Sequence, residues 1–261
     1  MSFIIIPLTA LIASILTFFS GFGLGTILLP VFSLYYPAPI AVLLTAIVHF
    51  SNNIFKIGLV YKNINWNLIY KFGIPSMIMA FFGAFCLKSM FQYSITIFQY
   101  SINTHSFNIT LFNIIIGLLI IIFSLFEVIP YLKNLSFNTN KLIIGGLLSG
   151  FFGGLSGHQG ALRSAFLIRL NLQKEQFVAT GTAIACLVDI ARMSIYAITL
   201  EFTNVIEHKT LLLISVSFAI IGAFIGNKLL KKTTISFLKW TVTLFMLAIG
   251  ILMIFGILNA Q

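Results

Sequence analysis

Long apolar runs, separated by short polar stretches, make up most of the chain. Five of them reach or approach the length of a membrane span: 38–61, 72–87, 111–128, 211–229 and 241–258. A helix needs about 20 apolar residues to cross the hydrocarbon core of a bilayer, and fewer where polar side chains at its ends reach the interface. The pattern therefore predicts an all-α integral membrane protein that crosses the membrane several times.

Two other apolar segments are broken by runs of glycine, one near the N-terminus and one in the middle of the chain. The first break joins residues 3–19 to 26–36, and the second joins 142–152 to 161–170. Three continuous spans follow each broken segment: the five runs above and a sixth over about 175–200, which carries charged residues near its middle. The sequence thus predicts two sets of elements, each made of a glycine-broken helical hairpin and three transmembrane helices.

Short matches at nearly constant spacing indicate that these two sets are copies of one another. The matching pairs are Ser20 to Gly25 with Ser156 to Gly160, Asn53-x-x-Lys56 with Asp189-x-x-Arg192, Thr45-Ala46-Ile47 with Thr182-Ala183-Ile184, and Gly83-Ala84-Phe85 with Gly222-Ala223-Phe224. Matches in one order along the chain are the signature of an internal repeat. We expect an N-terminal transmembrane repeat over 1–132 and a C-terminal one over 140–261, joined by a polar stretch.

The basic residues between the spans predict how the chain is threaded. If each broken segment enters and returns on one side, ten basic residues share that side: Lys62, Lys71, Lys133, Lys141, Arg169, Lys174, Lys228, Lys231, Lys232 and Lys239. Only Lys88 and Lys209 fall on the other side. If each broken segment crosses once, the same residues divide five against seven. Basic loops face the cytoplasm, so the first arrangement is favoured. It inverts the two repeats and places both termini outside the cytoplasm.

Composition agrees with a multi-pass membrane protein. Hydrophobic residues make up 59% of the 261 residues and charged residues 8%, whereas a soluble domain carries about 25% charged residues. The net charge of +10 lies in short loops and accompanies no nucleic-acid-binding motif, so we expect no nucleic-acid partner. Cys86 and Cys186 form no CxxC pair, and we expect no metal or cofactor. A homo-oligomer is left open.

Glycines at the breaks are candidates for binding an anion. Gly23 and Gly25 in the first break, and Gly157 and Gly160 in the second, can turn the chain and leave backbone N–H groups accessible. The helical arms that follow would point positive ends at a bound anion. Close helix packing is the alternative, and it suits the four-residue spacing of 146, 150 and 154 well.

Charged residues inside the spans are the sharper signal for function. A charge at the bilayer centre costs at least about 2.5–3.5 kcal/mol, so it is usually functional or paired. Arg163 has a planar guanidinium that suits an oxyanion. Lys56 either lines the route or extends to the membrane surface. Asp189 and Arg192 either form an ion pair or act on substrate, and Asp189 is the best candidate for proton coupling.

Polar uncharged residues also lie at or near the breaks. His158 and Gln159 occupy the second break, and Asn53 lies with His49 and Asn52 near the centre of its span. Such side chains either hydrogen-bond an anion or join neighbouring helices. We count His158, Gln159 and Asn53 among the candidate substrate-binding residues, and His158 also as a candidate for carrying a proton.

At these residues the chain resembles the TauE/SafE family of sulfite exporters and sulfonate permeases. The resemblance lies in Gly21-x-Gly-x-Gly-x-x-x-x-Pro30, Lys62-x-x-x-Trp66, the stretch from Gly150 to Arg163, and Ala179-Thr-Gly-Thr182. It implies transport of sulfite, organosulfonates or related small oxyanions across a bacterial or archaeal cytoplasmic membrane, with the glycine breaks lining the path. His158, Gln159, Arg163 and Ser164 stand where that family often has more glycine and a proline.

The function we expect is therefore secondary transport rather than catalysis. Inverted repeats with a broken element near the midplane are the layout of many secondary transporters, which suggests alternating access, with or without coupled protons. A passive anion channel and a carrier for a non-sulfur carboxylate remain alternatives. A membrane-embedded enzyme is disfavoured because the chain has no HExxH run and its five acidic residues are scattered.

Overall fold

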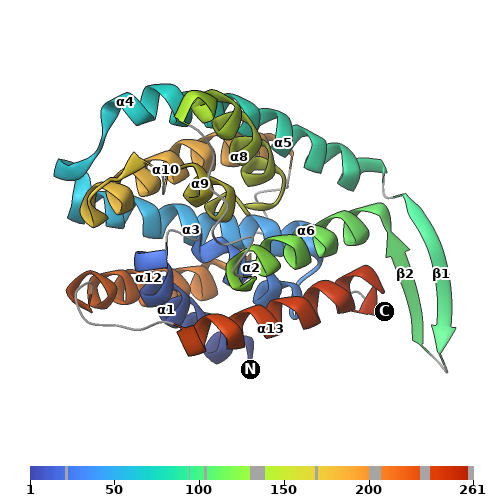
Figure 1. Ribbon diagram of the computed structural model, residues 1–261. Coiled ribbons are helices and arrows are strands. Elements are labelled where there is room, and N and C mark those ends of the chain that lie inside the picture. The colour runs from blue at the N-terminus through green and yellow to red at the C-terminus, as the bar shows by residue number, and fades with distance from the viewer. Residues whose placement is uncertain are drawn as a thin grey trace.

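The computed structural model describes residues 1–20, 23–93, 95–102, 105–129, 139–167, 170–199, 207–229 and 236–257. They form a bundle of helices with one short β-hairpin at its edge (Figure 1). The first half contains α1 (Ser2–Ser20), α2 (Leu24–Ser33), α3 (Ala38–Val60), η1 (Tyr61–Asn63), α4 (Trp66–Leu68), η2 (Ile69–Gly73), α5 (Ile74–Tyr93), β1 (Thr96–Ile102), β2 (His105–Thr110) and α6 (Leu111–Val128). The second contains η3 (Thr139–Lys141), α8 (Leu142–Ser156), α9 (Gly160–Leu167), α10 (Lys174–Thr199), α12 (Lys209–Leu229) and α13 (Ser236–Ile254).

The bundle has the dimensions and the surface of a membrane protein. Four described stretches are long and apolar enough to span a bilayer: Ile40–Asn63, Trp66–Met90, Lys174–Ile198 and Lys209–Lys228. Large apolar side chains face outward, including Phe82, Leu213 and Ile198, which are at least 60% exposed. Four charged side chains of the described residues, in contrast, are buried in the interior. This distribution suits lipid outside and a polar centre, and the prediction of an all-α multi-pass membrane protein is confirmed.

Glycine shapes both breaks, in different ways. Gly157 ends α8 with a left-handed backbone (φ +80°), a conformation that favours glycine because it has no Cβ. Its N–H donates to the carbonyl of Gly153 (2.8 Å). Gly23 precedes α2 with an extended backbone (φ −82°, ψ 138°). Gly21, the first glycine of that run, lies outside the described residues.

The two broken hairpins, α1–α2 and α8–α9, open toward opposite ends of the bundle. Leu142 at the start of α8 and Leu170 just after α9 line one shallow cavity with Lys71, so the second hairpin returns to the end where it began. Tyr36, just after α2, packs edge-on against His208 at the start of α12 (4.7 Å between ring centroids). Helix α12 runs parallel to α1, because successive α12 glycines face successive turns of α1. The starts of α1 and α12 therefore lie at the same end of the bundle, and α2 ends there too. The first hairpin thus also returns to the end where it began, which is the end opposite to that of the second hairpin.

Packing between the halves is reciprocal. Helix α5 of the first half packs along α8 of the second, and α12 of the second packs along α1 of the first, while α3 pairs with α10 and α6 with α13. Exchanging the two halves leaves this set of pairs unchanged, as related repeats require. The inverted relation of the halves stays a prediction that this packing supports.

Small residues allow the closest of these helix contacts. Gly150 and Gly154 lie directly against the backbone of α5, and Gly146 lies against that of η2 just before it, so a Cβ at any of the three would overlap backbone atoms. Gly222 does the same for α12 against α1. The packing interpretation of the four-residue spacing in α8 is therefore right.

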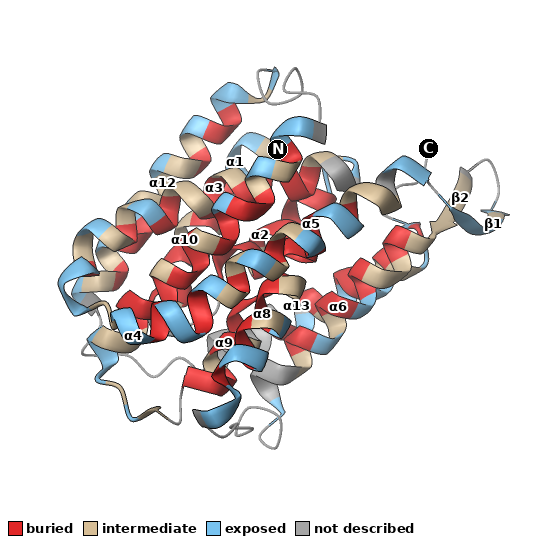
Figure 2. Cartoon of the chain, turned by 90° about the horizontal axis from the view of Figure 1, so that it is seen from above, coloured by how far each residue is buried: buried red, intermediate tan, exposed pale blue. Residues whose placement is uncertain are grey.

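The β-hairpin is an element that the apolar pattern did not predict. Strands β1 and β2 pair antiparallel, and the ring of Tyr100 stacks on those of Phe98 and Phe107. The Tyr100 hydroxyl donates to the carbonyl of Phe255, just after α13 (2.8 Å). The segment is rich in β-branched and aromatic residues, which favour strands, but its apolar residues merge with those of the neighbouring spans. The hairpin lies at the edge of the bundle, away from its buried centre (Figure 2).

Candidate functional site

The two broken hairpins meet at the centre of the bundle. A Cβ placed on Gly23 would lie 3.9 Å from the carbonyl oxygen of Gly157 and 3.1 Å from Nε2 of His49. Gly25 faces Thr45 and the same imidazole on α3. The start of α2 thus lies against the end of α8, in the space between α3 and α10.

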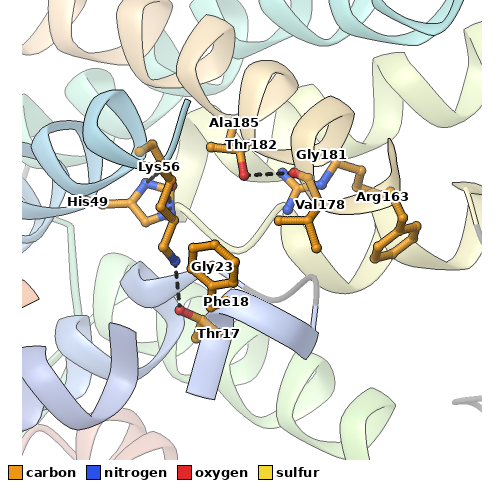
Figure 3. A pocket seen from close by; sticks show the side chains of 12 residues that line it. Thr17, Phe18, Gly23, His49, Lys56, Arg163, Val178, Gly181, Thr182 and Ala185 are labelled. Carbon is orange, nitrogen blue, oxygen red and sulfur yellow. Dashed lines mark hydrogen bonds between the residues drawn. The ribbon is translucent and has the colours of Figure 1, made fainter. Parts of the chain in front are cut away.

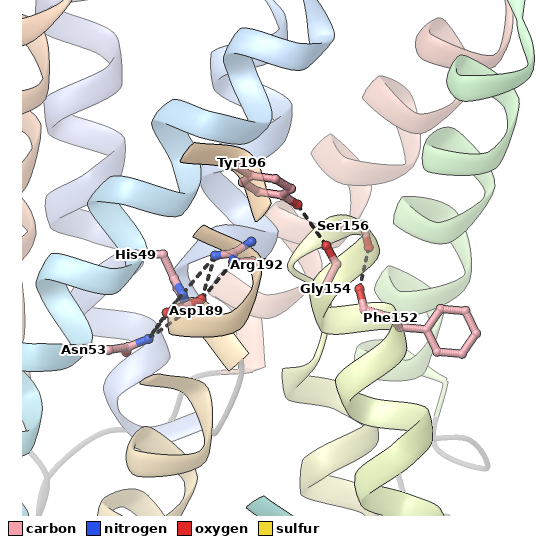
Figure 4. A network of polar contacts seen from close by, with 8 residues as sticks. All are labelled: His49, Asn53, Phe152, Gly154, Ser156, Asp189, Arg192 and Tyr196. Carbon is pink, nitrogen blue, oxygen red and sulfur yellow. Dashed lines mark hydrogen bonds and ion pairs between the residues drawn. The ribbon is translucent and has the colours of Figure 1, made fainter. Parts of the chain in front are cut away.

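Asp189 on α10 is the hub of a buried polar network (Figure 4). Its Oδ1 accepts from Nε of Arg192 (2.9 Å) and pairs with Nη2 of the same side chain (2.8 Å). Its Oδ2 accepts from Nδ1 of His49 (2.7 Å) and from the Asn53 amide (3.1 Å). The ion pair with Arg192 is the pairing that the i, i+3 spacing predicts. His49 and Asn53 join neighbouring helices of opposite halves, the second of the two roles considered for them.

Arg192 and Tyr196 hold the end of α8 in place. A Cβ on Gly157 would come within 2.6 Å of Nη1 of Arg192, so the guanidinium lies directly on the turn. The Tyr196 hydroxyl donates to the carbonyl of Gly154 (2.9 Å). The side chains of α10 therefore position the second break, and Arg192 is engaged by a carboxylate.

A polar cavity lies beside this network (Figure 3). Its wall combines both hairpins with α3 and α10: Thr17, Phe18, Gly23, His49, Asn53, Lys56, Arg163, Phe177, Val178, Gly181, Thr182 and Ala185. The space inside is about 20 Å³, slightly more than the roughly 10–15 Å³ that a single water molecule needs. Only a small ligand suits such a space, and even that requires some side chains to move.

Lys56 enters the cavity from α3 and is almost fully buried (4% exposed). Its ammonium donates to Thr17 Oγ1 (3.5 Å) and lies over the Phe18 ring (5.3 Å to the centroid). The Asn52 amide, oriented so that its nitrogen donates to the Ala219 carbonyl and to Ser14, accepts from Lys56 through its oxygen (3.3 Å). In the part of the chain that the structure describes, this cation is therefore held by neutral groups alone, and it does not extend to the membrane surface.

Arg163 enters the cavity from the opposite side, on α9. It lies one turn after the break, and its N–H donates to the carbonyl of Gln159 (3.0 Å). Its guanidinium lies against Gly181 of α10, where an added Cβ would be 3.4 Å from Nε. Lys56 and Arg163, from different halves, thus line the same cavity.

The charges at the centre of the bundle do not balance. Among the described residues, the buried charged side chains are Lys56, Arg163, Arg192 and Asp189. Within this described set, three cations stand against one carboxylate, an excess of two positive charges. An anion bound between Lys56 and Arg163 would offset this excess.

A model of the family described as Sulfite exporter TauE/SafE matches residues 6–253. The chain belongs to the TauE/SafE family. Family membership agrees with a multi-pass membrane transport protein rather than an enzyme, and it confirms the resemblance seen in the sequence. No curated protein matches the chain, and no solved structure matches it.

The structure brings together part of the candidate set in this TauE/SafE chain. Four candidates line the cavity: Arg163, Lys56, Asn53 and Gly23. Arg192 and Asp189 lie beside it in the ion pair. The remaining candidates, Gly25, Gly157, Gly160, His158 and Gln159, are buried at the breaks but do not line the cavity. Substrate contact remains a prediction for all of them.

His158 and Gln159 are buried in the second break with polar atoms left over. In the described part of the chain, Nε2 of His158 and both amide atoms of Gln159 have no hydrogen-bond partner. Gln159 lies beside Gly153 and Val188, whereas the His158 ring stacks on Phe123 of α6. A buried polar atom without a partner lowers the stability of the fold by about 1–3 kcal/mol. A functional or structural role is therefore expected for these groups.

Several wall residues of the TauE/SafE cavity were not among the candidates. The unforeseen part of the wall is Thr17, Phe18, Phe177, Val178, Gly181, Thr182 and Ala185. Thr17 and Phe18 come directly before the first break, which was a usable signal. Phe177 and Val178 look like ordinary lipid-facing residues in the sequence, because only the rotation of α10 decides which face they occupy.

Proposed function

We propose that the chain is a secondary transporter that carries sulfite or a similarly small oxyanion across the cytoplasmic membrane by alternating access. The observation that carries this proposal is the buried excess of positive charge at a cavity between the two halves. Because a charge at this depth costs about 2.5–3.5 kcal/mol, an excess of buried positive charge is expected to serve an anion.

Lys56 and Arg163 are the proposed ligands of the anion. Charge-assisted hydrogen bonds are short and strong, and a guanidinium can hold two oxygens at once. Gly23 brings the N-terminus of a helix to the site, because it directly precedes α2 and lines the cavity. Free N–H groups of a first helical turn favour negative charge.

The size of the cavity supports a small inorganic oxyanion over an organosulfonate with a large substituent. It also supports a carrier over a channel, because a space of about 20 Å³ holds little more than one water molecule. Two hairpins that open toward opposite ends and meet at the cavity suit a mechanism in which each half in turn uncovers the site. We propose that the end with Lys71 and Leu142 faces the cytoplasm, as basic loops do.

A binding measurement tests this proposal. Purified protein in detergent is heated with sulfite, thiosulfate, taurine or acetate, and the melting temperature is recorded. A ligand at 100 times its Kd stabilises the folded state by about 2.7 kcal/mol, so sulfite should raise the melting temperature and larger anions less. Arg163→Gln should abolish the shift, while Lys174→Gln, at an exposed lysine, should preserve it.

Two results would contradict the proposal. One is that no anion in the set raises the melting temperature of the wild-type protein. The other is that Arg163→Gln responds to sulfite at the same concentrations as the wild type.

A further inference from the structure

His158 lies at the break between α8 and α9 with its ring fixed on both sides. Its side chain is 1% exposed, and the imidazole stacks on the ring of Phe123 with 5.8 Å between centroids and 8° between planes. Nδ1 lies 3.0 Å from Oγ of Ser156. Nε2 is buried and has no hydrogen-bond partner in the described part of the chain.

The hydroxyl of Ser156 decides which ring nitrogen carries the hydrogen. A hydroxyl has one hydrogen to donate, and Ser156 donates it to the carbonyl of Phe152 (3.1 Å). Toward His158, Ser156 Oγ must therefore accept, so Nδ1 of the imidazole carries the hydrogen. In the neutral ring Nε2 is then a lone-pair acceptor, which is a poor ligand for an anion and a suitable one for a proton.

Asp189 is less suited to take up a proton. Each of its oxygens already faces two donor nitrogens, two of Arg192 at Oδ1 and one each of His49 and Asn53 at Oδ2. Protonation would break the pairing that neutralises Arg192, and breaking a buried ion pair costs about 3–5 kcal/mol. His49 is also engaged, because its Nδ1 donates to Asp189.

We propose that Nε2 of His158 takes up the proton that moves together with the transported anion. This inference rests on the proposed transport function. The Nε2 lone pair binds H⁺ to give an imidazolium, Nδ1–H remains bonded to Ser156, and release of H⁺ restores the neutral ring. No other bond forms or breaks.

The surrounding charges make binding of the proton and of the anion depend on one another. Arg192 from α10 faces the same break, and the contact from α6 is the apolar ring of Phe123. Arg163 on α9 and Lys56 on α3 line the neighbouring cavity. These cations oppose a positive charge on His158. An anion bound at the cavity offsets them, so each ligand raises the affinity for the other, as linkage requires. The expected result is co-transport of a proton with the anion.

Uptake driven by a pH gradient tests the inference. Proteoliposomes are given radiolabelled sulfite at slightly alkaline pH, with the voltage clamped by potassium and an ionophore and with protein-free vesicles as the blank. One coupled proton gives up to about tenfold accumulation per unit of pH gradient, since one pH unit equals 1.36 kcal/mol. His158→Phe preserves an aromatic ring against Phe123 but cannot be protonated, and it should reduce the accumulation ratio to about one while downhill flux stays measurable.

Two further variants make the test decisive. His208→Phe is the matched control, because His208 also contacts an aromatic ring, that of Tyr36, outside the site, and it should accumulate sulfite as the wild type does. His158→Gln replaces the phenylalanine variant if that one does not fold. Full accumulation in either His158 variant, or no accumulation in the wild type, overturns the inference. Downhill flux that still requires Arg163 would leave the proposed transport function standing in either case.

Discussion

Lys56 and Arg192 occupy matching places in the two halves, and their surroundings are opposite. Lys56 lies three residues after Asn53, and Arg192 lies three residues after Asp189, the counterpart of Asn53 in the second repeat. Arg192 is neutralised by that carboxylate at 2.8 Å. The partners of Lys56 among the described residues are neutral, at 3.3 Å and 3.5 Å. Replacing each cation with methionine, whose unbranched chain fills irregular space, should therefore have opposite effects on stability.

For Lys56→Met, the loss of a buried charge should outweigh the loss of its hydrogen bonds. The charge costs about 2.5–3.5 kcal/mol at this depth, and its weak bonds to Thr17 and Asn52 contribute about 1 kcal/mol together. We expect the free energy of unfolding to rise by about 1.5–2.5 kcal/mol as the difference. Sulfite affinity should fall about 10- to 150-fold, since a charged hydrogen bond contributes about 1.5–3 kcal/mol.

For Arg192→Met, the ion pair breaks and Asp189 is left as a buried carboxylate held only by neutral donors. Removing one partner of a buried pair costs about 3–5 kcal/mol, and the turn at Gly157 loses the guanidinium that rests on it. We therefore expect this variant to be less stable than the wild type, with or without sulfite.

Melting temperature in detergent, recorded over a series of sulfite concentrations, measures both effects in one assay. Lys56→Met should melt at or above the wild-type temperature and need far more sulfite for the same shift. The reasoning is refuted if Lys56→Met loses as much stability as Arg192→Met, or if its sulfite response matches that of the wild type.

Three smaller predictions concern packing and turns. Gly150→Ala places a Cβ on the backbone of α5 and should lower the free energy of unfolding by about 1–3 kcal/mol or more. Gly58→Ala has nothing within 4 Å of the added Cβ and should be neutral or stabilising by about 0.5–1 kcal/mol. Comparing the melting temperatures of the two variants checks this, and equal losses would contradict it. Gly157→Ala should cost about 1–2 kcal/mol from its left-handed backbone alone and also weaken sulfite binding, so intact affinity would be the contrary result. Tyr100→Phe removes the bond to Phe255 and should cost about 0.5–1.5 kcal/mol, seen as faster hydrogen exchange in the β-hairpin rather than as altered flux.

Much of the architecture could be predicted because lipid imposes a simple pattern. Apolar length marks the spans, and runs of glycine mark the breaks. Intramembrane charge is costly enough to be informative, so Lys56 and Arg163 could be singled out before they were known to share a cavity. The spacing of Asp189 and Arg192 also indicated the ion pair that the structure shows.

The rest depended on helix rotation and on contacts between the halves. Nothing local in the sequence tells that His49 reaches Asp189 across 140 residues, or that the ring of His158 turns to α6 while Arg163, one turn later, faces the cavity. Phe177 lines the site with a side chain that could equally face lipid. The β-hairpin was missed because its alternating residues lie between two spans of the same overall hydropathy.

Sulfite flux through the purified protein tests the central claim most directly. Proteoliposomes loaded with radiolabelled sulfite are diluted into sulfite-free buffer, and efflux is compared for wild type, Arg163→Gln and Lys174→Gln. The account predicts saturable efflux for wild type and Lys174→Gln, and efflux near that of protein-free vesicles for Arg163→Gln. Equal efflux from Arg163→Gln and wild type would contradict it.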